Sequence, residues 1–233
     1  MYNEMFPTFI DAGAVEDMSS YVTDEDKKEY KYLSNGNMMD GQYGWPLVTG
    51  VPFVLYYNED ILNELGEKAP ETWDDFARIC KEATKDTDGD GKVDQYGFAC
   101  GLNTSDIGAK QILNAYYYGA LWQNGGQIYD DDLKSVTFAN EEGKEAMTWL
   151  KDLTQYMNTD YMSQSWSDAF ANVFGAGKAA FGITRSSQTD ETSFKKTYPD
   201  LNWDFVTSLQ QKEYGTFGAT DCLTLMSAAE DKD

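Results

Sequence analysis

Hydrophobic positions change period along the chain, which predicts strands alternating with helices. The run Val51–Tyr57 is apolar, β-branched and aromatic throughout, as is typical of a strand covered on both faces. The next segment, Asn58–Gly66, has apolar residues on one helical face, with Asn58 placed to cap its start and Gly66 to end it. This part of the sequence therefore predicts a strand that leads directly into a helix.

Two further helices are predicted from caps and apolar spacing. Thr72 is placed to cap one helix, and the apolar face that follows is expected in the core: Trp73, Phe76, Ile79, Cys80 and Ala83. Asn140 is placed to cap a helix over 140–157, with acids in its first turn. The side chains expected to point inward from it are Ala146, Met147, Leu150 and Leu153.

Short strand candidates lie between helical stretches in the rest of the chain. The helical stretches are 107–118 and 167–174, and the strand candidates are 96–99, 136–138, 179–183, 203–206 and 223–226. Strands alternating with helices predict an α/β fold with a largely parallel sheet.

The charge of the chain excludes one class of partner. Forty acidic against 18 basic residues leave a formal net charge of -22, which repels phosphate backbones, so no nucleic acid is expected. The acids are spread along the chain, as on a solvated acidic surface. No run of about 18 apolar residues occurs, so no membrane-spanning helix is predicted.

Cysteine and histidine usage argues against catalysis and against a thiolate metal site. The three cysteines, Cys80, Cys100 and Cys222, show no CxxC spacing and are expected to be small buried apolar residues. The sequence contains no histidine, which removes the commonest general base and the usual transition-metal ligand. The chain is therefore not expected to be an enzyme.

Five segments occur in an order that resembles a known family. They are DGQYGWP at 40–46, VLYYN at 54–58, TWDDF at 72–76, LWQNGG at 121–126 and AFANVFGAGKAAF at 169–181. Together they resemble the family 1 extracellular solute-binding proteins, the sugar-binding subunits of ATP-driven (ABC) importers.

The resemblance implies a two-lobed, periplasmic-binding-protein-like α/β fold that closes on its ligand by a hinge. It places 1–50 and 218–233 in the first lobe and 51–217 in the second, with crossings near 46–52 and 215–219. Family members begin with a lipoprotein signal and a first β-α-β unit and end with further helices. This chain has neither, so the resemblance implies a fragment that is incomplete at both ends.

The resemblance also implies the biological setting. The full-length protein is expected to be a monomeric cell-surface lipoprotein or periplasmic protein. It would capture an oligosaccharide reversibly and deliver it to the transmembrane permease subunits of the importer.

Aromatic side chains near the ends of elements are the candidate sugar contacts, because sugars stack their apolar faces on aromatic rings. These residues are Trp45, Trp122, Trp166 and Phe217. Each alone is better explained by packing, but at least one of the four is expected to stack on ligand. Of the triplet 116–118, which cannot all face one side of a helix, one ring is expected to face the site.

Polar candidates follow the predicted strands, where open sheets bind ligands. They are Asn103, Thr104 and Asp106 after one strand, and Arg185 after another. Thr49 lies in the crossing Pro46–Pro52, whose glycine allows close backbone approach to a ligand; an ordinary strand start explains that segment equally well.

The segment 86–94 (DTDGDGKVD) has the spacing of a calcium loop. Asp86, Asp88 and Asp90 occupy positions 1, 3 and 5, the Lys92 carbonyl position 7, and Asp94 position 9. Position 12 departs from the pattern, because Gly97 stands where the bidentate glutamate is usual. A structural Ca²⁺ is predicted, and the alternative is a solvated acidic turn.

Two other functions fit parts of the sequence. Aromatic loops and abundant acids also suit a glycoside hydrolase with two carboxylates. A calcium-dependent docking module is the third possibility, but a single loop inside a large α/β chain argues against it.

Overall fold

The computed structural model describes residues 1, 5–103, 112–130, 134–186 and 191–230. The chain divides into two compact units. Unit 1 comprises Met1–Val51 and Gly218–Asp233, and unit 2 comprises Pro52–Phe217. That these two units are lobes that close on a ligand stays a prediction.

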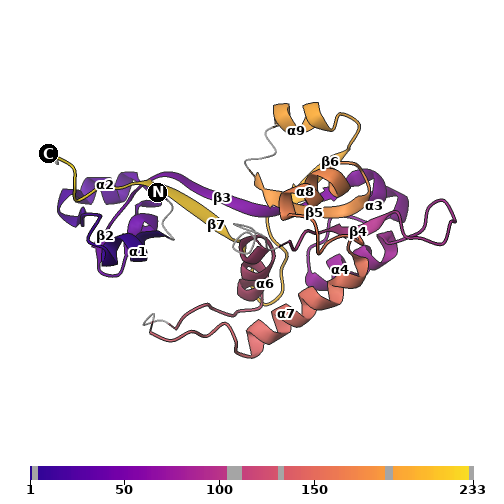
Figure 1. Ribbon diagram of the computed structural model, residues 1–233, viewed down its shortest axis with the longest axis horizontal. Helices are drawn as coiled ribbons and strands as arrows, with labels where there is room; N and C mark the ends of the chain where they lie inside the picture. The colour runs from indigo at the N-terminus through magenta and orange to yellow at the C-terminus, as the bar shows by residue number, and fades with distance from the viewer. Residues whose placement is uncertain (2–4, 104–111, 131–133, 187–190, 231–233) are drawn as a thin grey trace. The chain divides into compact units, whose positions relative to one another are not determined.

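Unit 2 contains the larger sheet and most of the helices (Figure 1). Its strands are β3 (Trp45–Asn58, which enters from unit 1), β4 (Tyr96–Ala99), β5 (Ala179–Arg185) and β6 (Trp203–Val206). Its α-helices are α3 (Glu59–Leu65), α4 (Trp73–Ala83), α6 (Tyr118–Gln123), α7 (Glu141–Leu153), α8 (Trp166–Ala169) and α9 (Glu191–Thr197). Two π-helical turns, Leu113–Tyr117 and Phe170–Phe174, adjoin α6 and α8.

The sheet is mixed, which corrects the expectation of a largely parallel one. The strand order is β4-β5-β3-β6, and β4 pairs with β5 in parallel. β3 lies between β5 and β6 and is antiparallel to both. β3 leads through α3 and α4 into β4, yet these two strands run in opposite directions, so their helical connection is not a parallel crossover.

Helices cover both faces of this sheet, and the alternation of β3 side chains shows why (Figure 1). Phe53 and Leu55 point into the core cluster under α3, α4, α6 and α7. Val54 and Tyr56 point into the second cluster, with the π-helical turn 170–174 and α9. The prediction of a strand covered on both faces is thus confirmed.

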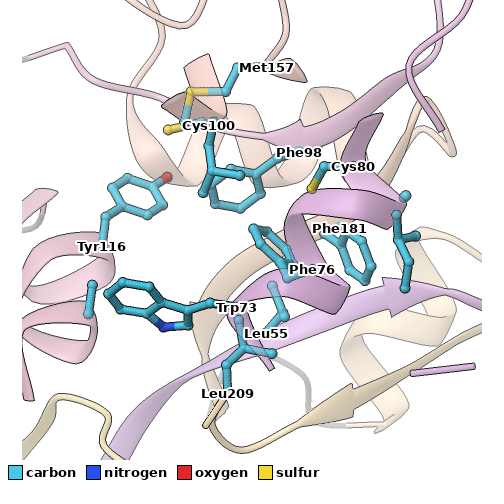
Figure 2. Packing of buried hydrophobic residues seen from close by; sticks show 14 of the residues in the cluster. Leu55, Trp73, Phe76, Cys80, Phe98, Cys100, Tyr116, Met157, Phe181 and Leu209 are labelled. Atoms are coloured by element: carbon cyan, nitrogen blue, oxygen red, sulfur yellow. The ribbon is translucent and has the colours of Figure 1, made fainter. Parts of the chain in front are cut away.

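Aromatic rings pack against one another within the larger core cluster (Figure 2). The ring of Phe76 lies 4.8 Å from that of Phe181 and 5.4 Å from that of Phe98, between centroids. Trp73 stacks on Trp149 with centroids 4.2 Å apart. The five residues predicted for the core face of α4 are all buried.

The predicted helix caps are present. The Asn58 side chain accepts hydrogen bonds from the backbone N–H groups of Asp60 and Ile61, and α3 ends at Gly66 with φ 73°. Thr72 forms a capping box with Asp75 at the start of α4, and Asn140 accepts from the Gly143 N–H at the start of α7. Local capping therefore determines where these helices begin.

Several expectations were wrong in detail. Met147 is 51% exposed and not in the core, because α7 buries a narrower stripe that includes Ala146 and Leu153. Residues 136–138 form only an isolated bridge between Val136 and Tyr129. The helix predicted over 140–157 ends at Leu153, where a short 3-10 turn begins. The exposure of Met147, the lack of a longer strand at 136–138 and the end of α7 depend on contacts that local periodicity does not encode.

Unit 1 is built from short elements. They are α1 (Phe6–Asp11), α2 (Asp24–Glu29), the hairpin of β1 (Asn37–Met38) and β2 (Gly41–Gln42), the start of β3, and β7 (Gly218–Leu223). β7 pairs with β3 and lies earlier than the predicted strand at 223–226, where Met226 instead forms a bridge with Val15. Phe6 and Cys222 are buried beside Gly44. Cys80, Cys100 and Cys222 are all buried free thiols, as predicted.

Candidate functional site

Three half-buried aromatic rings stack on one another in unit 2. The rings of Trp122 and Phe217 are nearly parallel, with planes 10° apart and centroids separated by 6.2 Å. Tyr118, one helical turn before Trp122 on α6, lies 5.8 Å from Trp122 and 5.9 Å from Phe217. Tyr118 is therefore the member of the tyrosine triplet that joins the site, whereas Tyr116 and Tyr117 are buried.

The buried ring of Phe53 connects this stack to two further candidates. Phe53 lies 6.3 Å from Phe217 and 5.5 Å, edge to face, from Trp166 at the start of α8. The guanidinium of Arg185 lies 5.5 Å from the centroid of Phe53, a cation–π distance. We call the six residues Phe53, Tyr118, Trp122, Trp166, Arg185 and Phe217 the aromatic cluster.

Backbone pairing brings these side chains together. Phe53 and Arg185 are register partners in the β3–β5 pair. The Phe53 N–H donates to the Phe217 carbonyl over 2.9 Å, which places residue 217 beside β3. Next to Trp166, the Asn103 side chain donates to the Ser163 carbonyl over 3.0 Å, and the Asn103 N–H donates to the Gln164 carbonyl over 2.9 Å. Asn103 thus links the end of β4 to the segment before α8.

The aromatic cluster has the chemistry of a carbohydrate platform. Half-buried flat rings offer apolar surface to the C–H faces of a sugar ring, and a guanidinium offers several hydrogen-bond donors to hydroxyl oxygens. Phe53 is buried, and its ring contacts those of Trp166 and Phe217, which limits the space in which these two rings can move.

The structure brings together four of the nine predicted ligand contacts: Trp122, Trp166, Arg185 and Phe217. Trp45 lies in unit 1, edge to face with Tyr30 at 5.1 Å. Thr49 lies in β3, and its side chain is not described. Thr104 and Asp106 lie outside the described residues. Phe53 was not predicted, because its place in an apolar strand is the signal of a core residue.

The carboxylate loop between α4 and β4 is closed by hydrogen bonds to its own acids. Asp86 accepts from the Gly91 N–H over 2.7 Å and the Gly89 N–H over 2.6 Å, and the Gly91 bond is the main cause of its lowered pKa. Asp94 accepts from both the N–H and the hydroxyl of Thr87. Carboxylate oxygens of Asp86, Asp88 and Asp94 lie within 4.8 Å of one another.

Two other members of the predicted calcium loop are placed differently. Asp90 accepts from the Lys92 N–H over 2.8 Å, and its carboxylate lies 3.8 Å from the Lys92 ammonium. Gly97 is buried against α4, where an added Cβ would lie 2.3 Å from the Cys80 carbonyl oxygen. A glutamate at position 12 is therefore sterically excluded.

The family model for bacterial extracellular solute-binding proteins matches the whole chain, residues 1–233. No curated protein sequence matches it. Among the described residues, no helix combines the length and apolar composition that crossing a bilayer requires.

Solved structures share the fold at low sequence identity. An ABC substrate-binding protein of Listeria monocytogenes in complex with cycloalternan superposes with a TM-score of 0.73 at 19% identity. The MalE domain of Bdellovibrio bacteriovorus bound to maltotriose gives 0.72 at 15%, and MalX of Streptococcus pneumoniae in complex with maltopentaose gives 0.70 at 20%. The alignments cover 99% of this chain but 56%, 56% and 58% of the respective relatives, so it spans little more than half their length.

Proposed function

Because the chain belongs to the bacterial extracellular solute-binding protein family, we propose that it captures an oligosaccharide reversibly for an ABC importer. The observation that carries the proposal is the stack of Tyr118, Trp122 and Phe217 in unit 2. Three related folds bound to oligosaccharides support the same substrate class.

The cellular setting follows from the family. Extracellular placement is part of the family description, and a lipid anchor and delivery to permease subunits are our proposals. A monomeric protein with a net charge of -22 fits this setting, since like charges keep molecules apart.

The same observations favour binding over glycoside hydrolysis. A hydrolase needs two carboxyl groups flanking the bond to be broken. The aromatic cluster contains one cation and no carboxylate, and the family is one of binding proteins.

Calorimetric titration of the chain with maltose, maltotriose and maltopentaose tests the function. We expect an oligosaccharide to bind and to raise the melting temperature, and amino acids and nucleotides to do neither. Trp122→Ala should weaken sugar binding by about 1–3 kcal/mol, because it removes one face of the stack.

Tyr214→Ala is the matched control, since Tyr214 is an aromatic residue of the same segment as Phe217 but is 68% exposed. It should leave the affinity unchanged. If amino acids alone bind, the proposed function is wrong. If Trp122→Ala lowers stability and leaves sugar affinity intact, Trp122 is a core residue and the platform lies elsewhere.

For the loop 86–94, we propose a structural Ca²⁺ held by Asp86, Asp88 and Asp94, with Asp90 and the Lys92 carbonyl as further ligands. Three carboxylates with oxygens within 4.8 Å repel one another, and a hard dication that takes about six to eight oxygen ligands removes that repulsion. Water molecules would supply the oxygen ligands that Gly97, at position 12, lacks. The ion would fix the connection between α4 and β4, away from the aromatic cluster.

Chelation of calcium-loaded protein is expected to lower its melting temperature and to leave sugar affinity nearly unchanged. Calcium at about a hundred times its dissociation constant stabilises the folded state by about 2.7 kcal/mol. Asp88→Ala should abolish the effect of the chelator, as followed by calorimetry.

Asp152→Ala, which removes one exposed carboxylate from α7, is the control and should retain the effect of the chelator. Equal restoration by magnesium, or no response of metal-loaded protein to chelator, would establish the solvated acidic turn instead.

A further inference from the structure

The side chain of Gln123, at the end of α6, connects three segments of unit 2. Its Oε1 accepts a hydrogen bond from Trp73 Nε1 over 2.7 Å. Its Nε2 donates to the Gly215 carbonyl over 2.7 Å and to Ser208 Oγ over 3.3 Å. The residue is only 9% exposed, so these bonds form where water competes poorly.

The partners determine which way this amide points. An indole N–H only donates and a backbone carbonyl only accepts, so the Gln123 oxygen must face Trp73 and its nitrogen must face Gly215. A glutamate would bring a second acceptor against the Gly215 carbonyl. An apolar side chain would remove the acceptor of the Trp73 N–H and would leave the Gly215 carbonyl with the hydrogen bond from Ser208 Oγ.

The backbone of the same residue holds the same segment. The Gln123 carbonyl accepts from the N–H groups of Lys212 and Glu213, each over 2.9 Å. Ser208 Oγ closes the segment on itself, since it accepts from the Gly215 N–H and donates to the Gly215 carbonyl. Segment 208–215 is thus bonded to α6 through both the side chain and the backbone of Gln123.

This tie lies directly beside the stacked rings. Gln123 follows Trp122, and Gly215 is two residues before Phe217. At Gly215 an added Cβ would lie 2.9 Å from Trp122 Cβ. The backbone of the segment therefore packs so closely against the base of the Trp122 side chain that no Cβ fits between them. On its other side, Phe217 is bonded to the backbone of Phe53.

We infer that Gln123 is a positioning residue for the ligand platform: its amide holds segment 208–217 against α6, so that Phe217 is stacked on Trp122 before a ligand arrives. The inference rests on the proposed function only in taking this stack as the sugar-binding surface. Preorganisation of this kind raises affinity because binding does not have to order the rings.

The test places 4-fluorophenylalanine at position 217 of the 233-residue chain and follows its ¹⁹F resonance without ligand. The Trp122→Ala variant gives the ¹⁹F chemical shift that the ring at position 217 has when it is not stacked on Trp122. We expect Gln123→Leu to move the resonance toward that value and to broaden it. Segment 208–217 then loses the side-chain bonds to Gly215 and Ser208, nearest to Phe217, and keeps only the backbone bonds from Lys212 and Glu213.

Asn124→Ala is the matched control. Asn124 is the next residue, is 1% exposed, and donates to the Glu142 carbonyl and to Glu145 Oε2, both associated with α7. Its loss should lower stability as Gln123→Leu does but leave the resonance of residue 217 in place. A resonance that moves equally in both variants, or in neither, would show that Gln123 is merely structural.

Gly215→Ala keeps the Gln123 amide and covers the case in which Gln123→Leu does not fold. Its methyl group must push the segment away from Trp122, so it should shift the resonance in the same direction. An unchanged resonance in this variant would count against the inference.

Affinity gives the second measurement. Gln123→Leu should weaken maltotriose binding about tenfold, or about 1.4 kcal/mol, and should have no further effect in a Phe217→Ala background. If none of the sugars binds the unaltered chain, the proposed function fails, while the ¹⁹F result still decides the role of Gln123.

Discussion

Replacing Phe76 with alanine is expected to lower the free energy of unfolding by about 3–5 kcal/mol. Phe76 is 1% exposed, and its ring contacts those of Phe98 and Phe181 (Figure 2) and that of Trp149. The lost side chain would leave a cavity that these rigid rings cannot fill. Urea unfolding followed by circular dichroism measures the loss.

Phe138→Ala is the control for this substitution, because Phe138 is 42% exposed. This substitution should lower the free energy of unfolding by less than about 1 kcal/mol, as is usual for surface positions. Similar losses for the two variants would mean that the cluster around Phe76 is not the core of unit 2.

Gly97→Ala is expected to destabilise the protein by about 3 kcal/mol or more, at the upper end of overpacking costs. The new Cβ would lie 2.3 Å from the carbonyl oxygen and 2.5 Å from the Cα of Cys80. Both atoms belong to the backbone of α4, which cannot move aside without separating this helix from β4. Thermal and urea unfolding would report the change.

The same substitution at Gly119 should not destabilise the protein. Gly119 lies inside α6, and its added Cβ would meet nothing closer than 3.7 Å. Alanine is favoured over glycine in a helix by about 0.5–1 kcal/mol, so Gly119→Ala should be neutral or stabilising. If Gly97→Ala were equally harmless, the close approach of β4 to α4 would be wrong.

Gly97 also connects the fold to the carboxylate loop. It stands at the position where a calcium loop usually has its bidentate glutamate, and packing against Cys80 excludes any side chain there. The departure from the motif is therefore a requirement of the α4–β4 contact. It carries no information about whether the first nine positions bind an ion.

The sequence alone was sufficient for elements determined by neighbouring residues. The starts of α3, α4 and α7 were predicted from Asn58, Thr72 and Asn140, because a cap bonds to backbone groups only two or three residues away. The two-sided burial of β3 was predicted from an unbroken apolar run, since each face of a strand takes every second residue.

Tertiary structure decided what depends on residues far apart in the chain. The antiparallel direction of β3 between β5 and β6 depends on pairing with strands far along the chain, which no local pattern encodes. Met147 fits a helical stripe by spacing, yet its side chain is 51% exposed.

The candidate site, too, was predicted in part from the sequence and decided in part by the tertiary structure. Residue type and position beside element ends were enough to nominate Trp122, Trp166, Arg185 and Phe217, because aromatic rings outside a regular apolar pattern are visible in the sequence. Their assembly around Phe53 was not predictable, since Phe53 looks like any core residue of an apolar strand. The stacking of Phe217 on Trp122 depends on hydrogen bonds from Gln123 to a segment about 90 residues away, and only the folded chain brings those groups within bonding distance.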